Sequence, residues 1–135
     1  MRALFADTFY YLAVVNDRDP WHELAADYGQ DDDIRVVTTG WVLTEVGDAL
    51  SETARNRTMF GRLYASMRAN PDVLIVPFSD ELFDAGLDLY ARRPDKEWSL
   101  TDCVSFVVMQ RNGLTEALTG DHHFTQAGFV PLLRP

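Results

Sequence analysis

Cysteine is nearly absent from this sequence, because Cys103 is the only one among 135 residues. A single cysteine excludes an intrachain disulfide, so the chain is not a disulfide-stabilised secreted scaffold. A reducing cytoplasm is the expected location. We expect Cys103 itself to pack in the core, since a nucleophilic thiolate would need a nearby base.

Long hydrophobic runs are also missing. No apolar stretch approaches the roughly 18 residues that a membrane-spanning helix needs. The first apolar stretch meets Asp7 too early for the hydrophobic region of a signal peptide. We therefore expect neither a membrane association nor export.

Positive charge is scarce, with 12 Lys and Arg against 21 Asp and Glu, for a net charge of −9. This sign opposes binding to nucleic acid, because Lys and Arg supply most of the affinity for phosphate. Bound divalent ions would cancel carboxylate charge locally. Even if four acids served such a site, five excess negative charges would remain. A basic partner protein or a locally basic face is then expected.

Short apolar segments alternate with segments of helical periodicity. The pattern predicts strands over 2–6, 34–38, 73–76, 116–119 and 129–132, and helices over 21–28, 40–54, 58–69, 80–92, 100–112 and 122–127. The uninterrupted apolar run at 73–76 is typical of a strand buried on both faces. Such alternation indicates one α/β domain over residues 1–135, with a mostly parallel sheet covered on both sides.

Four acidic residues lie in segments where a parallel α/β sheet usually has its ligand-binding site. Asp7 and Asp121 directly follow predicted strands, and Asp102 lies in the first turn of an apolar helix. Glu45 lies inside the helix after the second strand, at the edge of its apolar face. Ligands bind at the carboxyl ends of parallel strands, which would bring such acids together. Each like-charged pair about 5 Å apart costs roughly 3 kcal/mol, so clustered carboxylates need protons or a metal ion such as Mg²⁺ or Mn²⁺.

Each acid also has a purely structural explanation. Asp7, Asp102 and Asp121 could each cap a helix, with Asp102 in a capping box with Ser99. Glu45 could belong to a solvated acidic stripe on its helix. Spacing alone leaves both interpretations open.

Four segments carry a family resemblance: Leu-Phe-Ala-Asp-Thr-Phe-Tyr-Tyr-Leu at 4–12, Thr-Gly-Trp-Val-Leu-Thr-Glu-Val at 39–46, Ser-Leu-Thr-Asp-Cys-Val-Ser-Phe at 99–106, and Leu-Thr-Gly-Asp-His-His-Phe-Thr-Gln-Ala-Gly-Phe at 118–129. With these segments in this order, the chain resembles the PIN-domain family and, within it, the stand-alone toxins of the VapC-like type. The third segment is the most specific of the four. The match extends over nearly the whole chain.

The resemblance implies a three-layer α/β/α sandwich and an endonuclease that cleaves single-stranded RNA. Its acidic pocket would bind Mg²⁺ or Mn²⁺ through Asp7, Glu45, Asp102 and Asp121. Many such proteins are toxins neutralised by an antitoxin protein, and a homodimer is usual. Neighbouring hydroxyls would orient the carboxylates or water on the metal: Thr8, Ser99, Thr101 and Thr119.

Basic and aromatic side chains outside these segments are candidates for contacts with other molecules. Arg55, Arg57, Arg62 and Arg68 are candidates for contacts with the RNA backbone, although a solvated helix face also explains them. The apolar residues Leu63, Tyr64 and Met67 could serve an interface with a second copy or an antitoxin helix, and core packing is the simpler explanation.

Two adjacent histidines, His122 and His123, invite a metal interpretation. Neighbouring side chains on a helix point in different directions, so we expect them not to grip one ion together. A structural or substrate-facing role is expected instead.

Other functions fit the sequence less well. A phosphatase of the haloacid dehalogenase type needs an Asp-x-Asp motif, and here Asp7 is followed by Thr8 and Phe9. A receiver domain needs a late lysine, whereas the only lysine is Lys96 in a predicted loop. The remaining alternative is a catalytically silent PIN-like module that binds RNA or protein, although degenerate members usually lose acids.

Overall fold

A computed structural model describes residues 1–134, whose five strands form one parallel sheet in the order β3-β2-β1-β4-β5. The strands are β1 (Arg2–Ala6), β2 (Ile34–Thr39), β3 (Val73–Val76), β4 (Glu116–Leu118) and β5 (Val130–Pro131). β1 lies in the middle, with Leu4 paired to Val36 of β2 and Phe5 paired to Ala117 of β4. All five predicted strands are therefore confirmed.

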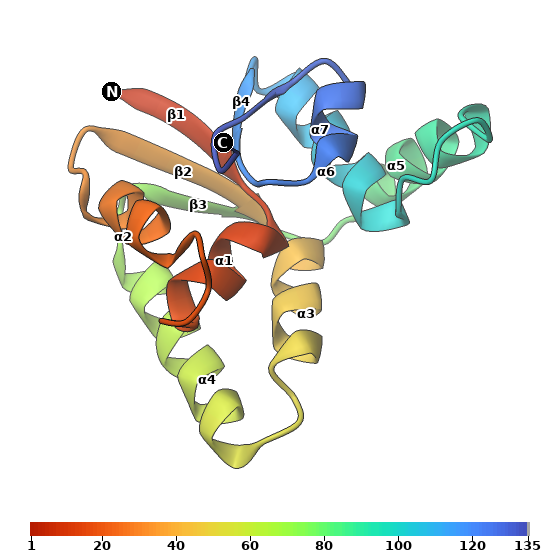
Figure 1. Cartoon of the computed structure of the whole chain (residues 1–135). Coiled ribbons are helices and arrows are strands. Elements are labelled where there is room, and N and C mark those ends of the chain that lie inside the picture. The colour runs from red at the N-terminus through yellow and green to blue at the C-terminus, as the bar shows by residue number, and fades with distance from the viewer. Residues whose placement is uncertain (135) are drawn as a thin grey trace.

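Helices cover both faces of this sheet (Figure 1). One face carries α1 (Thr8–Val15), α2 (His22–Gln30), α3 (Gly40–Ala49) and α4 (Ala54–Ala69), and the other carries α5 (Asp80–Arg92), α6 (Leu100–Arg111) and α7 (His122–Gln126). From the central strand β1 the chain adds β2 and then β3 on one side, and it then crosses to the other side of β1 to add β4 and β5. Because crossovers between parallel strands are right-handed, this reversal places the later helices on the opposite face. The predicted three-layer α/β/α architecture is confirmed.

The core centres on β1. Leu4, Phe5 and Ala6 have no exposed surface, because helices cover both faces of the central strand. Behind them Phe124 of α7 is also fully buried, and its ring lies 6.3 Å from Phe5 and 5.0 Å from Phe106 of α6. Burial of one such side chain contributes roughly 2–3 kcal/mol to folding. Among residues 1–134, no helix is long and apolar enough to cross a bilayer.

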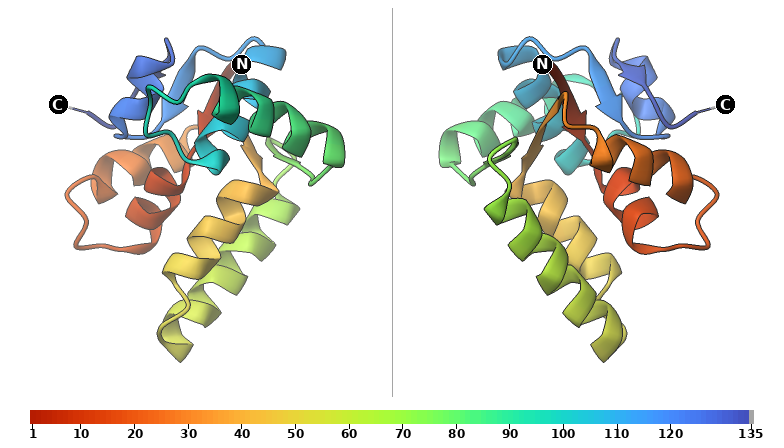
Figure 2. Two further views of the ribbon diagram at one scale, coloured as in Figure 1. Left: turned by 90° about the vertical axis from the view of Figure 1, so that its right-hand side faces the viewer. Right: turned by 90° about the vertical axis from the view of Figure 1, so that its left-hand side faces the viewer.

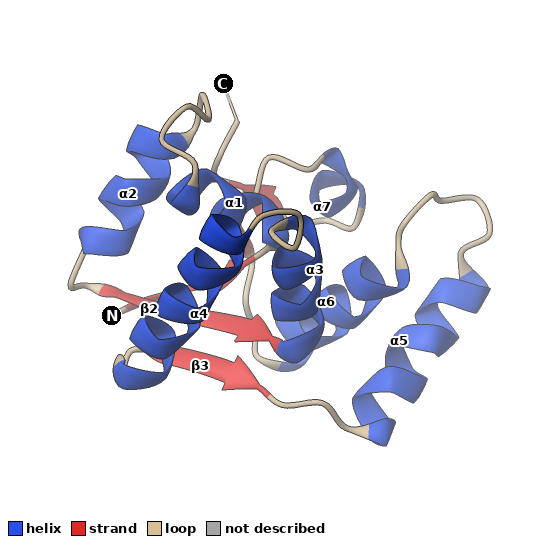
Figure 3. Cartoon of the chain, turned by 90° about the horizontal axis from the view of Figure 1, so that it is seen from below, coloured by secondary structure: helices blue, strands red, loops and turns tan. Residues whose placement is uncertain are grey.

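Two expectations about the second crossover are wrong. The first helix of this pair ends at Ala49 and the second begins at Ala54, where the Thr53 hydroxyl caps it by accepting a hydrogen bond from the amide of Asn56. The pair forms a helical hairpin that projects away from the sheet (Figure 2), and in the view from below α4 lies in front of β2 and β3 (Figure 3). Strand β3 is not buried on both faces, because it is an edge strand and Leu74 is 49% exposed.

The order of the strands fixes where a ligand would bind. The strand order reverses between β1 and β4: β2 and β3 lie on one side of β1, and β4 and β5 lie on the other. Open α/β sheets bind ligands at such a switch point. Asp7 directly follows β1, and Thr119 to Asp121 follow β4. Asp7 and Asp121 therefore lie at the same edge of the sheet, because they follow neighbouring parallel strands.

Candidate active site

A cavity of about 470 Å³ lies at the carboxyl ends of β1 and β4. The four acids singled out from the sequence all line it, although they come from positions far apart in the chain. The complete lining is Asp7, Thr8, Phe9, Glu45, Glu97, Ser99, Asp102, Asp121 and His123. The structure therefore brings the predicted acids together, together with a fifth acid and a histidine.

Asp7 is the most buried acid of the cavity, at 6% exposed. It occupies the N-cap position of α1, but its side chain accepts no capping hydrogen bond, so the capping explanation is wrong. Its Oδ2 instead accepts a hydrogen bond from the Thr119 hydroxyl at 2.8 Å. The pKa of Asp7 is raised to about 7, mainly because burial disfavours its charged form. The hydrogen bond from Thr119 lowers this pKa, whereas the negative charges of Asp102 and Glu45 raise it.

Glu45 projects from α3 towards the same cavity and is half-buried. Its Oε1 accepts a hydrogen bond of 2.6 Å from the hydroxyl of Thr8, the residue after Asp7. Asp48 and Glu52, by contrast, are exposed. The acidic-stripe explanation therefore fails for Glu45, because this carboxylate is held over the cavity while its neighbours face solvent.

Asp102 caps a helix and also faces the cavity. The predicted capping box is present, since the Ser99 hydroxyl accepts from the Asp102 amide at 3.0 Å and Asp102 Oδ2 accepts from the Ser99 amide at 3.2 Å. The same Oδ2 lies 3.0 Å from His123 Nδ1. Burial raises the pKa of Asp102, and the negative charge of Asp121 raises it as well. The hydrogen bonds with Ser99 and His123 lower it.

Asp121 is likewise both a cap and a cavity residue. Its Oδ1 accepts from the His123 amide at 2.9 Å, which caps α7. The Thr119 hydroxyl accepts from the Asp121 amide at 3.1 Å while donating to Asp7. One threonine therefore links the acid after β1 to the acid after β4.

Three of the four predicted hydroxyls contact the acidic residues: Thr8 donates to the Glu45 carboxylate and Thr119 to the Asp7 carboxylate, whereas Ser99 accepts from the Asp102 backbone amide. Thr101 does not. It is half-buried on α6, does not line the cavity, and its side chain makes no hydrogen bond within residues 1–134. The reason is geometric, because Thr101 lies one residue before Asp102 and an adjacent helical position points about 100° away.

The sequence did not single out Glu97, which lines the cavity from the connector before α6. The next residue, Trp98, is 6% exposed, and its Nε1 donates to Gln126 Oε1 at 2.9 Å. This anchor holds the connector against α7 and brings Glu97 to the rim. The only signal in the sequence was an aromatic residue in an otherwise polar connector.

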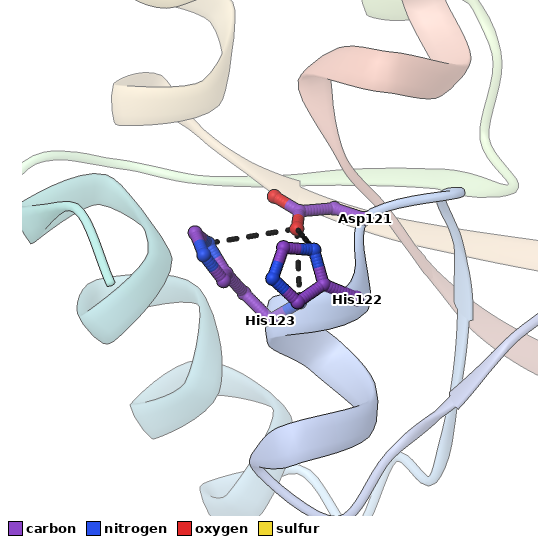
Figure 4. Close-up of side chains that lie close together, drawn as sticks. All are labelled: Asp121, His122 and His123. Carbon is purple, nitrogen blue, oxygen red and sulfur yellow. Dashed lines mark hydrogen bonds and ion pairs between the residues drawn. The ribbon is translucent and has the colours of Figure 1, made fainter. Parts of the chain in front are cut away.

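The expectation that the two histidine side chains point in different directions is wrong, whereas their sharing of an ion stays untested. Their ring centroids lie 4.5 Å apart, and both Nδ1 atoms approach Asp121 Oδ1, at 3.6 Å for His122 and 3.5 Å for His123 (Figure 4). Side chains in a first helical turn lean back towards the helix N-terminus, and here they lean towards the capping acid.

The candidate RNA-contacting arginines lie elsewhere. Arg55, Arg57 and Arg62 are exposed on α4 and do not line the acidic cavity. Arg57 Nε donates to the Ser51 carbonyl at 2.7 Å, which fastens the turn of the hairpin. Arg68 lines a separate cavity between α3 and α4.

Residues expected to pack in the core divide between core and surface. Cys103 is buried as expected, and burial raises the pKa of its thiol to about 11. Met67 is 5% exposed, Leu63 is half-buried and Tyr64 is 41% exposed. Core packing therefore explains Met67, whereas the exposed ring of Tyr64 is accessible to another molecule.

The donors of the cavity fit a hard divalent cation. Among residues 1–134, five carboxylates line it and neither Lys nor Arg does, so no side chain of positive charge offsets their negative charge there. Mg²⁺ and Mn²⁺ prefer such oxygen ligands. Burial raises the pKa of Asp7 and so disfavours its ionised form, which a bound cation would favour.

Comparisons with known proteins identify the family of this chain. A family model described as the PIN domain matches residues 4–130. Two relatives described as the 23S rRNA-specific endonuclease VapC20, from two strains of Mycobacterium tuberculosis, are each 28% identical over 127 residues, which cover 94% of this chain and 95% of the relative. The crystal structure of Mycobacterium tuberculosis VapC20, described as a Sarcin-Ricin loop cleaving toxin, matches with a TM-score of 0.82 at 26% identity, covering 98% of this chain and 99% of that one. Because the family model spans nearly all of the sequence, this chain belongs to the PIN domain family.

Proposed function

We propose that this protein is an endoribonuclease that requires Mg²⁺ or Mn²⁺ and cleaves single-stranded RNA at the four-carboxylate cavity. The observation that carries the proposal is the convergence of Asp7, Glu45, Asp102 and Asp121 on one cavity without a neutralising Lys or Arg. Such a cluster repels a phosphodiester unless a cation is present, so carboxylates and substrate require the same ion.

The four acids and the side chains that hold them have defined tasks in this proposal. The four acids would hold the cation, which when bound would polarise the scissile phosphate and activate the attacking water. Thr119 holds the Asp7 carboxylate by donating to its Oδ2, and Thr8 holds Glu45 in the same way. His123 fixes Asp102 by donating from Nδ1 to Oδ2. These contacts fix the carboxylates before substrate binds, which lowers the reorganisation that the reaction requires.

The names of the relatives support RNA as the substrate and a toxin as the biological role. Cellular RNA fits the cytoplasmic location that the single cysteine indicates. Contacts of Arg55, Arg57 and Arg62 with the RNA backbone are part of the proposal, as is a homodimer. An antitoxin would dock on an apolar cavity of about 500 Å³ between α3 and α4, at whose rim Phe78 is 60% exposed and Tyr64 is 41% exposed.

Cleavage of labelled single-stranded RNA tests the function. We expect the wild-type protein to cleave with Mg²⁺ or Mn²⁺ and to stop when EDTA is added. Glu45→Gln should lower the rate by at least about 100-fold, since even an outer partner of a metal ligand is worth 10–100-fold. Glu52→Gln makes the same chemical change at an exposed acid and should cleave normally.

The alternative is a silent module that binds RNA or protein. Wild-type protein that fails to cleave RNA with either metal, yet binds it equally with EDTA, would support that module and contradict the nuclease. Equal rates in Glu45→Gln and Glu52→Gln would contradict the site. Parallel assays on single-stranded DNA and double-stranded RNA decide the substrate class.

Thr119→Val should weaken metal-dependent cleavage by about 10–100-fold. Valine has a similar shape but removes the hydroxyl that donates to Asp7 and accepts from the Asp121 amide. Thr101→Val is the matched control, because Thr101 makes no such contact within residues 1–134 and should stay within about twofold of wild type. Titration of each variant with Mn²⁺ measures the effect, and similar losses in both variants would show that Thr119 has no special role.

A further inference from the structure

The two histidines place nitrogen atoms beside the carboxylates, and the proposed Mg²⁺ or Mn²⁺ chemistry does not use these nitrogens as metal ligands. His122 lies at the surface, with 66% of its side chain exposed, whereas the side chain of His123 is 18% exposed. One donor atom from each of Asp121, His122 and His123 lies within 4.8 Å of the other two (Figure 4). His123 also contacts Asp102. The group therefore offers two imidazoles and two carboxylates.

The spacing of three of these donor pairs is close to that in a small tetrahedral coordination shell. Zn²⁺ binds histidine nitrogen and carboxylate oxygen at about 2.0–2.1 Å, so two ligand atoms of a tetrahedron lie about 3.3–3.4 Å apart. Three donor pairs of the group lie at 3.0 Å (His123 Nδ1 to Asp102 Oδ2), 3.5 Å (His123 Nδ1 to Asp121 Oδ1) and 3.6 Å (His122 Nδ1 to Asp121 Oδ1). The donor atoms of Asp121, His122 and His123 all lie within 4.8 Å of one another, so side-chain rotations could bring these three onto one ion, with Asp102 beside His123 as the fourth donor.

The donor types select the ion. Imidazole suits Zn²⁺ and the other late first-row divalent ions, whereas Mg²⁺ prefers oxygen ligands alone. Both carboxylates of the group also belong to the cavity proposed for catalysis. An ion held by the histidines would therefore occupy Asp102 and Asp121 and displace the proton from His123 Nδ1 to solvent.

We propose that Asp102, Asp121, His122 and His123 form a site for Zn²⁺ or a similar late transition ion, and that this ion inhibits the enzyme by competing with Mg²⁺. The binding site stands on the donor geometry alone, and only the inhibition rests on the proposed nuclease function. Zinc held here removes two of the four acids from the catalytic arrangement. The protein would thus be active with one class of divalent ion and silenced by another.

Co²⁺ is a suitable probe, because a tetrahedral site with nitrogen ligands gives a much stronger visible absorption than an octahedral site of oxygen ligands. The full chain, without a histidine tag and freed of metal by chelation, is titrated with Co²⁺ and then with Zn²⁺. We expect a strong visible spectrum that Zn²⁺ abolishes. His122→Gln should lose this spectrum and bind Zn²⁺ at least about tenfold more weakly. His22→Gln is the matched control, because His22 lies on α2 and contacts the Ala13 carbonyl.

A weak spectrum of the octahedral type in wild type, or the same strong spectrum in His122→Gln, overturns the proposal. Circular dichroism of each variant separates loss of the ligand from loss of the fold. In the RNA assay with Mg²⁺ in excess, His122→Gln should need at least about tenfold more Zn²⁺ for half inhibition than wild type. If no metal supports cleavage but the Co²⁺ spectrum still requires His122, the nuclease proposal fails while the transition-metal site stands.

Discussion

Asp7→Asn is expected to abolish cleavage and, at the same time, to make the metal-free protein more stable. The loss of cleavage should reach at least about 10²–10³-fold, which is typical when one preorganised electrostatic group is removed from an active site. The gain in stability follows from burial, because Asp7 is 6% exposed and its charge has no cation beside it. Asparagine keeps the shape and removes the charge.

The pH dependence of this effect has a defined sign. The pKa of Asp7 is raised from 3.8 to about 7, so between these values the folded protein holds a proton that the unfolded chain has released. The contribution of Asp7 to the free energy of unfolding therefore falls as pH rises through that window, and it is fully unfavourable above pH 7. At 1.36 kcal/mol per pKa unit the cost is roughly 4 kcal/mol. Asp7→Asn removes it.

Thermal unfolding in EDTA measures the gain. At pH 8 Asp7→Asn should melt higher than wild type by on the order of 10 °C, and the difference should shrink towards pH 4. Mg²⁺ should raise the melting temperature of wild type and have little effect on the variant. Asp48→Asn is the matched control, because Asp48 is exposed on the same hairpin that carries Glu45. A variant that melts below wild type at pH 8 in EDTA would contradict this account of Asp7.

Most of the fold could be predicted because its strands are short, apolar and separated by helical periodicity. The errors lie where burial or a boundary depends on a partner. The run Val73–Val76 has the composition of a central strand, but its exposure follows from its place at the edge of the sheet. The boundary between α3 and α4 depended on which threonine caps the second helix, and Thr53 does so.

The candidate site was less predictable, although its acids follow from the rule that ligands bind at strand carboxyl ends. Capping and cavity lining looked like competing explanations, yet Asp102 does both, because the first turn of α6 is itself at the edge of the cavity. Glu97 and His123 join the site through tertiary packing of the connector and α7. Sequence spacing carries no record of such contacts. The role of the four acids as metal ligands stays a prediction.

Phe124→Ala should destabilise the protein by about 3–5 kcal/mol, the usual cost of removing a buried phenylalanine side chain. Phe124 is fully buried and joins the sheet to α6 through its contacts with Phe5 and Phe106. It also directly follows His123, so a cavity at this position loosens the turn that carries Asp121. Urea unfolding gives the free energy, with Phe83→Ala as the control, because Phe83 is 40% exposed on α5.

Asp7→Asn and Phe124→Ala should lose activity for opposite reasons, the first through loss of a metal ligand and the second through loss of folded protein. Phe124→Ala keeps every carboxylate of the cavity, so Mg²⁺ should still raise its melting temperature, and cooling should restore part of its cleavage as the folded fraction recovers. Asp7→Asn should gain neither from Mg²⁺ nor from cooling, since it is already folded and lacks the ligand. If Phe124→Ala unfolds as wild type does, the aromatic packing beneath α7 does not support the site. If it unfolds earlier but no longer responds to Mg²⁺, this packing positions Asp121 and His123 as well as stabilising the fold.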